Sequence, residues 1–286
     1  MANRILVVLA LLVLAGCPAP ESPDNGESPG TPEPTEDPGP VAVCLESEAF
    51  IAEGEFTLPA PGAPSDAHLV SGLRAAAHEG CDRFVIDLAT EAGDPATTVG
   101  SVSAEFLRDL GVVRVNLPDV PAIDPDASDA EFGGPLAKGA YVVIAPEQNG
   151  IYVDVHLGEP AEANVLVLSD PARVVVDLKP GGGEMPVPAQ ALNNVVVLAP
   201  RSGEASYPLT VFGYARLFEA NVVMRLEQGG ADVFEGFTTA TGWVDGWGDY
   251  SLTIPAGPSG EVTLHVGEYS AADGTWRGVE IDLEMP

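Results

Sequence analysis

The sequence predicts an all-β protein with only minor helix, in which two β-sandwich-type domains follow one another after a disordered tether. Gly and Pro number 32 and 27 of 286 residues, which favours turns and extended segments over long helices. The apolar runs are short and rich in β-branched residues, as strands are. They form two series on either side of a Gly-rich segment, 181–192, which is expected to be a linker.

Residues 1–17 are typical of an export signal. Arg4 precedes an apolar run, 5–14, that is too short to span a bilayer. The ending Leu14-Ala15-Gly16-Cys17 resembles the bacterial lipoprotein signal, in which the Cys is acylated and becomes the first mature residue. The alternative is an ordinary signal peptide with an incidental Cys. Acyl chains such as palmitate on Cys17 would anchor the chain to the cell membrane or outer membrane, facing the periplasm or the exterior.

Residues 18–42 are expected to form a disordered tether. Positions 18–40 contain eight Pro and six acidic residues but no basic residue. Such a composition cannot bury a core, and its charges repel one another. The tether would hold the folded part away from the membrane.

Residues 43–180 are predicted to form the first β domain. Its clearest expected strands are 84–88, 112–117, 141–144, 151–157, 164–168 and 173–178. The alternation in 151–157 is typical of a half-buried strand. Two stretches, 69–77 and 103–110, are expected to be helical, the second with Ser103 as N-cap and Gly111 beyond its end.

Residues 193–286 are predicted to form the second domain. Short strands are expected at 195–198, 209–212, 221–226, 251–254, 261–266 and 279–283. This spacing over fewer than a hundred residues favours a β-sandwich.

Cys44 and Cys81 are expected to form a disulfide, because an exported chain meets an oxidising compartment. Closing a loop of that span would stabilise the fold by roughly 4 kcal/mol. Two reduced, buried thiols are the alternative. A metal site is disfavoured because no Cys-x-x-Cys motif or His cluster accompanies the pair.

An internal similarity links 82–88 with 172–178, which share Arg, three apolar residues, Asp and Leu. Arg83 and Asp87 lie on one face of the first strand, and Arg173 and Asp177 lie on one face of the second. If the strands pair antiparallel, Arg83 faces Asp177 and Arg173 faces Asp87. Parallel pairing in the same register would place Arg opposite Arg, which is unfavourable.

These two strands carry a family resemblance. Residues 72–88 together with 169–178, which include Asp170-Pro171, resemble the AMIN-like domain of bacterial lipoproteins over about 43–180. Cys81 departs from the pattern, which usually has an aromatic residue there. The resemblance implies a β-rich envelope domain related to a fold that localises partners to the cell wall, and it implies no catalysis.

The last part of the chain resembles the immunoglobulin-like domain of bacterial spore-germination proteins. The resemblance is carried by 198–203, 206–209, 211–220, 246–250 and 267–274. It implies a β-sandwich, but it does not assign germination as the process, because such domains also occur in bacteria that never sporulate.

Charge excludes several function classes. There are 43 Asp and Glu against 12 Lys and Arg, a net charge of −31, so nucleic-acid binding is excluded and anionic glycans are poor ligands.

The four His lack a Gly-x-Ser-x-Gly partner motif, and no catalytic residue, cofactor or metal is predicted. The acidic loop Asp119–Glu131 resembles a calcium loop without its Gly and terminal Glu, and the sequence leaves calcium binding open there.

Aromatic residues in the second domain are the candidate binding residues. Trp243 and Trp276 lie in Gly- and Asp-flanked loops, and Trp247 and Tyr250 lie in a Gly-Trp-Gly-Asp-Tyr motif. Flat apolar rings can stack on sugar rings, although packing in the sandwich is the alternative use of each.

The sequence therefore predicts a non-catalytic, lipid-anchored envelope protein that acts as a binding or adaptor module at the cell wall. Its partner would be peptidoglycan or an envelope protein. The alternative is a structural or assembly subunit of an envelope complex that contacts other proteins through sheet edges.

Overall fold

A computed structural model describes residue 44 and residues 49–58, 64–145, 150–243 and 246–286. The predicted signal, Cys17 and the tether at 18–42 lie outside the described residues. The predicted all-β class is confirmed, because the described chain consists of strands, loops and three short 3-10 turns. Within that part of the chain, no helix has the length and apolar character needed to cross a bilayer.

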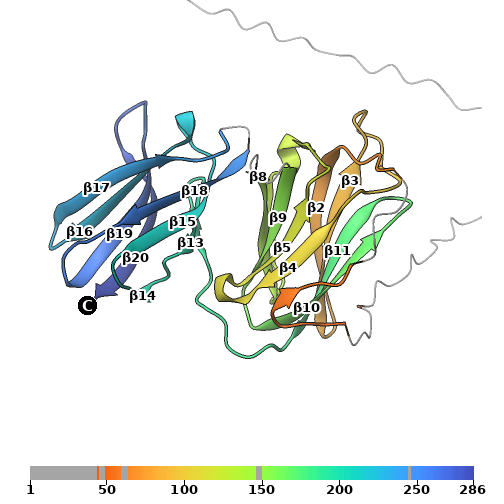
Figure 1. Cartoon of the computed structure of the whole chain (residues 1–286), viewed down its shortest axis with the longest axis horizontal. Coiled ribbons are helices and arrows are strands. Elements are labelled where there is room, and N and C mark those ends of the chain that lie inside the picture. Colours follow the sequence, from red (N-terminus) through yellow and green to blue (C-terminus); the bar gives the residue numbers. More distant parts are fainter. Residues whose placement is uncertain (1–43, 45–48, 59–63, 146–149, 244–245) are drawn as a thin grey trace, which may run out of the picture. The chain divides into compact units, whose positions relative to one another are not determined.

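The first half of the described chain has two facing sheets (Figure 1). One sheet is β10-β11-β3-β2-β6, and the other begins β1-β4-β5-β9-β8, with β7 paired to β8. The bounds of these strands are β1 Gly54–Glu55, β2 Leu69–His78, β3 Cys81–Ala89, β4 Ser103–Leu107, β5 Val112–Leu117, β6 Ala122–Ile123, β7 Asp129–Glu131, β8 Ala137–Ala145, β9 Gly150–Leu157, β10 Ala161–Leu168 and β11 Arg173–Pro180.

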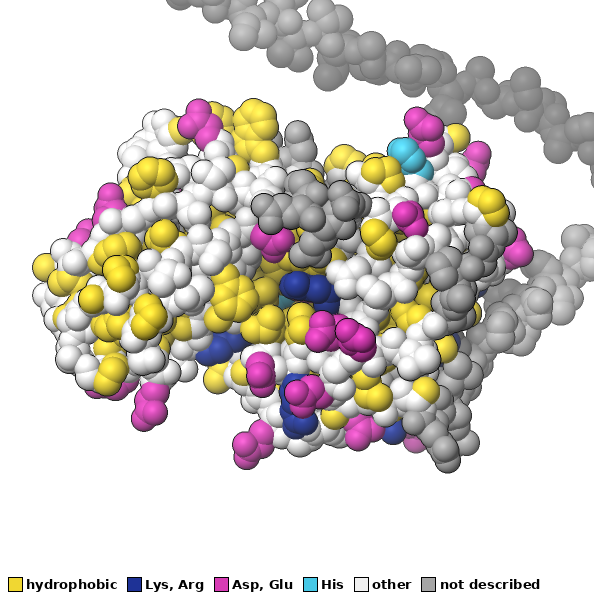
Figure 2. Space-filling model, viewed as in Figure 1, with side chains coloured by type: hydrophobic (Ala, Val, Ile, Leu, Met, Phe, Trp, Pro, Cys, Tyr) yellow, Lys and Arg dark blue, Asp and Glu magenta, His cyan; other side chains and the backbone are white. Residues whose placement is uncertain are grey.

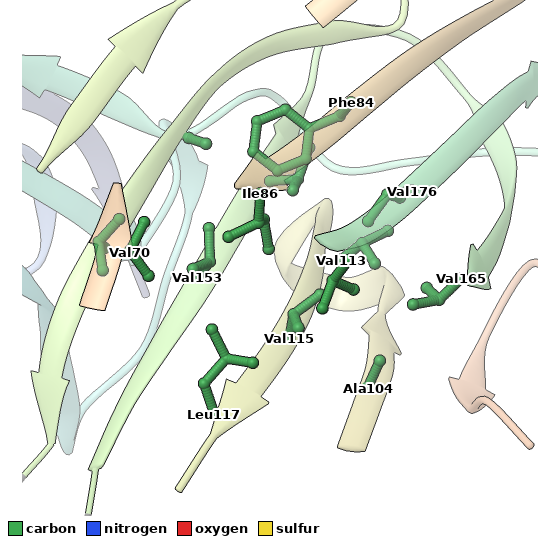
Figure 3. Close-up of a cluster of buried hydrophobic side chains, with 14 of the residues drawn as sticks. Val70, Phe84, Ile86, Ala104, Val113, Val115, Leu117, Val153, Val165 and Val176 are labelled. Atoms are coloured by element: carbon green, nitrogen blue, oxygen red, sulfur yellow. The ribbon is translucent and has the colours of Figure 1, made fainter. Parts of the chain in front are cut away.

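The core of this half lies between its two sheets. Alternate residues of β3, including Phe84 and Ile86, point inward and are fully buried. Val113 of β5 and Val153 of β9 meet them from the opposite sheet (Figure 3). Because side chains alternate along a strand, the apolar set of each strand reaches this one layer, and its burial supplies the main stabilisation.

The second half is also a sandwich. The sheet that begins β1-β4-β5-β9-β8 continues beyond β8 with β18, β15, β13 and β12. These four strands face the sheet β14-β20-β19-β16-β17. The bounds are β12 Gln190–Leu192, β13 Val195–Ala199, β14 Gly203–Glu204, β15 Leu209–Ala215, β16 Asn221–Gln228, β17 Ala231–Thr239, β18 Trp247–Ile254, β19 Gly260–Tyr269 and β20 Trp276–Met285. Its separate core includes Val211, Met224 and Leu264, all fully buried.

The two halves share one ten-stranded sheet, because β18 pairs parallel with β8 at Trp247↔Val143 and Gly248↔Ile144. A third apolar cluster, which includes Val143, Val196 and Trp247, packs the halves together. The expected linker 181–192 is shorter than predicted, because its last three residues form β12 against β13.

Both predicted helices are wrong. Residues 69–77 lie in β2, which pairs with β3 along its length through a two-residue turn that ends at Gly80, with φ of +82°. Residues 103–107 form β4, with Ser103 as its first residue and not as an N-cap, and only 108–110 make a 3-10 turn, which Gly111 follows in the left-handed conformation. Pairing with strong neighbouring strands outweighs the helix propensity of Ala and Leu, which is worth only tenths of a kcal/mol per residue.

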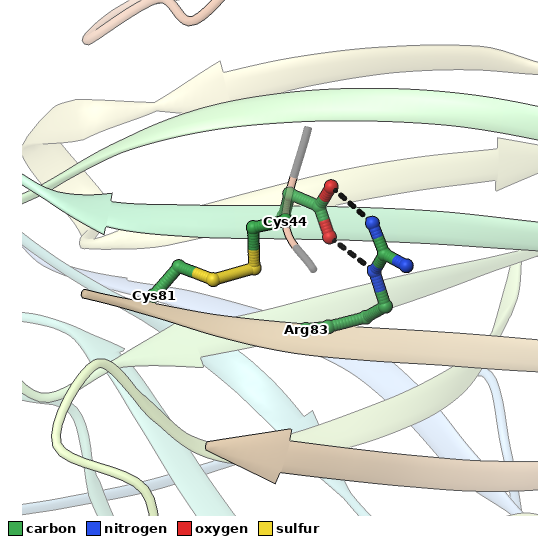
Figure 4. Close-up of a disulfide and its surroundings, with 4 residues drawn as sticks. Cys44, Cys81 and Arg83 are labelled. Carbon is green, nitrogen blue, oxygen red and sulfur yellow. Dashed lines mark hydrogen bonds and ion pairs between the residues drawn. A yellow bond between two sulfur atoms is a disulfide. The ribbon is translucent and has the colours of Figure 1, made fainter. Parts of the chain in front are cut away.

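The predicted Cys44–Cys81 disulfide is present, with the two Cα atoms 6.4 Å apart. It fastens the start of the described chain to the first residue of β3, close to Arg83 (Figure 4). The bridge therefore ties Cys44 directly to the core sheet.

The predicted antiparallel register of β3 and β11 is present, with Arg83 opposite Asp177 and Arg173 opposite Asp87. Arg83 donates two hydrogen bonds to the fully buried Asp177 carboxylate, at 2.6 and 2.8 Å. The second crossing differs from the expectation, because Asp87 accepts its two hydrogen bonds from Arg74 of β2 instead. One Arg–Asp pair of the predicted two is therefore formed between these strands.

Candidate functional site

Two of the four aromatic candidates are interior residues, which corrects the prediction that they form a binding surface. Trp247 is 4% exposed, and its Nε1 donates to the Asp129 carboxylate at 3.1 Å. Tyr250 is also 4% exposed, and its hydroxyl donates to the Val196 carbonyl at 2.9 Å. Trp247 packs in the cluster between the two halves and Tyr250 in the core of the second half, which agrees with the alternative that these rings pack in the sandwich.

The other two candidates lie in different parts of the second half. Trp243 is 54% exposed on the turn before β18, where its carbonyl accepts from the Gly246 amide at 2.9 Å. Trp276 starts β20 in the opposite sheet and is partly buried. The structure therefore does not bring the four predicted residues together into one site.

Trp276 belongs to a stack of side chains on the outer face of its sheet. The Arg225 guanidinium carbon lies 4.7 Å from the centre of the indole ring, in a cation–π contact. Tyr269 meets the indole edge-on at 5.2 Å, and His265 lies 6.1 Å away on the same strand as Tyr269. This packing holds Tyr269 in place, although 44% of the residue remains exposed.

Beside this stack is an open groove of about 450 Å³, which we call the aromatic groove. Phe218 and Tyr269 are its large apolar residues, and they are 54% and 44% exposed. Val223 of β16 also lines it, and Glu268 and Arg277 add polar groups. Exposed rings that share a concave surface with polar groups are the usual composition of a binding site.

Backbone conformation places Phe218 at the surface. Phe218–Ala220 forms a 3-10 turn after Leu217, which is buried in the core. Glu219 and Ala220 have φ of 55° and 54°, in the left-handed region that costs a non-glycine residue about 1–2 kcal/mol. Strain of this kind gathers at binding sites more often than elsewhere, and Glu219 itself lines the groove.

The opposite rim is a hydrogen-bonded turn between β19 and β20. Ser270 and Thr275 are joined by a backbone hydrogen bond of 2.8 Å. The Asp273 carboxylate accepts from the Thr275 hydroxyl at 2.7 Å and from its amide at 3.1 Å, and these bonds lower the Asp273 pKa to about 2. Asp273 therefore stays ionised and keeps this rim ordered at any physiological pH.

The charges around the groove limit its ligands. Glu219 and Glu268 lie on it with one cation, Arg277. Carboxylates are spread over the molecular face in Figure 2, where Lys and Arg are few. The groove can stack rings and exchange hydrogen bonds with a neutral or cationic group, whereas a polyanion would be repelled. None of the described residues that line it is a His, Cys or Lys.

The predicted acidic loop has other contacts. Asp119 accepts from the Ser101 amide at 2.8 Å, Asp124 accepts from the Asp126 amide at 3.0 Å, and Asp129 binds Arg216 at 3.1 Å. Among the described residues, no three His, Cys, Asp or Glu side chains are grouped as a metal site would need.

Sequence reasoning missed Phe218 and Tyr269. Both lie in segments that carry the immunoglobulin-like resemblance, and Tyr269 precedes an Asp-Gly turn signal at 273–274. The candidate set of three Trp residues and Tyr250 leaves out a Phe and a second Tyr next to turns, which are equally suited to exposed stacking.

Residues 194–275 match the family model described as the immunoglobulin-like domain of bacterial spore germination. The match includes Phe218, Tyr269 and most of the groove, and it ends one residue before Trp276. Comparison with curated proteins and with solved structures gave no match.

Proposed function

We propose that this chain is a non-catalytic bacterial envelope protein, anchored through lipid on Cys17, that acts as a binding or adaptor module at the cell wall. The signal-like ending at 14–17 and the AMIN-like resemblance of 43–180 support the location. The partner is peptidoglycan or an envelope protein, and the aromatic groove of the immunoglobulin-like domain is the contact.

One observation carries this proposal. Trp247 and Tyr250 are each 4% exposed, whereas Phe218 and Tyr269 present 54% and 44% of their surface around one groove. Ring faces stack on the C–H side of a sugar, and Asn221 and Arg277 at the groove offer hydrogen bonds to hydroxyl or peptide groups. The acidic surroundings favour neutral glycan or a protein over an anionic wall polymer.

A binding role fits the groove better than hydrolysis does. The imidazole of His156 is buried between the two halves and hydrogen-bonded to the Tyr214 hydroxyl, and it does not line the groove. Glu219 and Glu268 are the groove's carboxylates, and none of the described residues that line the groove is a His that could act as a general base beside them.

The proposal is tested with isolated peptidoglycan. The chain with Cys17→Ser, which cannot be acylated, is incubated with sedimented wall at low and high salt, and the retained fraction is measured. Phe218→Ala and Tyr269→Ala are each expected to weaken retention about 5- to 30-fold, because each removes about 1–2 kcal/mol of apolar contact. Trp243→Ala, which removes an equally exposed ring outside the groove, is the matched control and should bind normally.

Equal retention of all three variants would remove the groove from the proposal. Absence of retention by the parent chain at both salt concentrations would remove glycan as the partner and leave an envelope protein.

The alternative function is a structural or assembly subunit that contacts other envelope proteins through sheet edges. It is favoured by β17, a nine-residue edge strand that pairs only with β16 among the described strands. Cross-linking in cells separates the two functions, because an assembly subunit should yield a defined protein adduct whether or not the groove is intact.

A further inference from the structure

Strand β17 is a long open edge. It spans nine residues and ends the order β14-β20-β19-β16-β17. Among the described residues, β1, β6, β12 and β14 are edges of only two or three residues. The other long edge, β10, is partly covered by Ile51, whose amide and carbonyl both bond to Ala163. Figure 1 shows β17 at the margin of its sheet.

The side chains of β17 do not protect this edge. Val233 and Phe237 are 46% and 72% exposed, and Phe237 is the most exposed large apolar residue among those described. Edge strands are usually guarded by Lys or Pro, and β17 contains neither. A register irregularity opposite Leu226 and Glu227 is its one local interruption. The part of β17 from Glu235 to Phe237 lies beyond this irregularity, so it is regular and can pair with an added strand.

The charges on this edge are acidic. Asp232 is held by Arg225 at 3.0 Å, and Glu235 lies directly opposite Arg225 in the register with β16. Glu227 lies opposite Asp232 and adds a third carboxylate. An added strand would place its own side chains next to Glu235, where a Lys or Arg is favourable and an acidic residue is not.

Charge also narrows the choice of occupant. Two copies of this chain would each bring −31, and pairing of β17 with itself would set acidic edges against one another. The chain's own residues 18–40 carry eight Pro and no basic residue, so they can neither form the ladder nor neutralise Glu235. An extended segment of a different, basic protein satisfies both requirements.

We propose that β17 accepts an extended strand from a partner protein that places, at every second residue on one face, an apolar residue opposite Val233, a Lys or Arg opposite Glu235 and an apolar residue opposite Phe237. Backbone hydrogen bonds to the free edge would give affinity, and the side chains would set register. This inference rests on the assembly alternative and names its surface and the chemistry of its partner. It does not involve the aromatic groove.

The test uses the full chain and a fluorescent ten-residue peptide in which Val and Lys alternate at every second position, with Thr at the positions between them. Anisotropy titration measures binding, and hydrogen exchange measures protection of the amides at 231–239. The same peptide with alternate backbone nitrogens methylated keeps its charge but cannot form the ladder. We expect the unmethylated peptide to bind at least tenfold more tightly and to slow exchange in 231–239.

Variants locate the contact. Phe237→Lys is expected to weaken peptide binding at least tenfold, and Phe218→Lys, which adds the same charge at the groove, is expected to leave it within twofold. Thermal unfolding shows whether both variants fold. If Phe237→Lys does not fold, Val233→Lys serves as the second edge variant.

Equal binding of the methylated peptide, an equal effect of the two Lys variants, or unchanged exchange in 231–239 would each overturn the inference. Loss of peptidoglycan retention in Phe218→Ala with intact peptide binding would separate the groove from the edge, so the two proposals can fail independently.

Discussion

Acidification should destabilise the folded chain through His156, which lies where the two sandwiches meet. The imidazole is buried, and its Nε2 is hydrogen-bonded to the Tyr214 hydroxyl of β15. Burial, followed by the positive charges of Arg201 and Arg114, lowers the His156 pKa to about 3. The folded protein therefore holds this side chain neutral throughout the physiological range.

The sign of the pH effect on stability follows from the pKa of His156 in the folded and in the unfolded chain. An unfolded His titrates near pH 6.5, so below that pH the unfolded chain binds a proton that the folded chain refuses. The full stability is present above pH 6.5 and declines as the pH falls from 6.5 toward 3. At pH 5 the loss is about 2 kcal/mol, from roughly 1.5 pH units at 1.36 kcal/mol each.

Neighbouring carboxyls act in the opposite direction. Burial raises the pKa of Asp154 and of Asp249, so their contribution to stability increases as the pH falls. The His156 effect must therefore be measured as a difference between the parent chain and His156→Asn. Urea unfolding at pH 7.5 and pH 5.0 should show the stability advantage of the parent over this variant shrinking by about 2 kcal/mol.

Tyr214→Phe is the matched control, because it removes the hydrogen bond and keeps the imidazole buried. Its advantage over a Tyr214→Phe/His156→Asn double variant should shrink by a similar amount. Parallel pH profiles for the parent and His156→Asn would refute the reasoning, since they would mean that His156 accepts a proton in the folded state.

Three further predictions concern stability, each measured by denaturant unfolding. Replacing both residues of the Cys44–Cys81 pair by Ser should cost about 2–4 kcal/mol, because the unfolded chain gains the freedom of the opened loop; an unchanged midpoint in oxidising buffer would contradict this. Arg83→Met should cost about 3–5 kcal/mol, because Asp177 is 0% exposed and loses its bidentate partner, and adding Asp177→Leu should recover most of it. Glu219→Gly should stabilise by about 1 kcal/mol by relieving a φ of 55°, and a loss instead would mean that the Glu219 side chain stabilises the turn.

The strands of the core could be predicted because local pattern and tertiary environment agree there. Residues 112–117 were expected as a strand and form β5 with those bounds, and 173–178 form most of β11. The crossing of Arg83 with Asp177 followed from the two-residue period of a strand together with charge. The second crossing did not, because nothing in the strand pattern shows that Arg74 lies closer to Asp87 from the other side.

The two false helices show where local pattern is insufficient. Residues 75–77 are three consecutive Ala, a good helical sequence, yet they form the exposed end of β2. Their strand conformation is imposed by β3, through six further residues of pairing and the turn at Gly80. Strand β17 was not predicted for a different reason. An exposed edge strand buries few side chains, so its sequence has only a weak apolar alternation.

The candidate site was only partly predictable for a related reason. A Trp in sequence does not show which side of a sheet it occupies, and Trp247 and Tyr250 lie on β18, between the first half and the second core. Exposure of Phe218 depends on the left-handed backbone at Glu219, which the composition of 218–220 does not indicate.

The sequence pattern of the strand at 151–157 does not show that its polar side chains are buried. Their burial explains why the two sandwiches pack together. A half-buried strand was expected there, yet Tyr152, Asp154 and His156 are all buried as well. Asp154 receives two hydrogen bonds from Arg114 at 2.7 Å, and the Tyr152 hydroxyl bonds to Asp249 of the second half. Buried polar groups must be paired, and the Tyr152–Asp249 and His156–Tyr214 hydrogen bonds form only when the second half is present, so these two fix its position more specifically than apolar contact would.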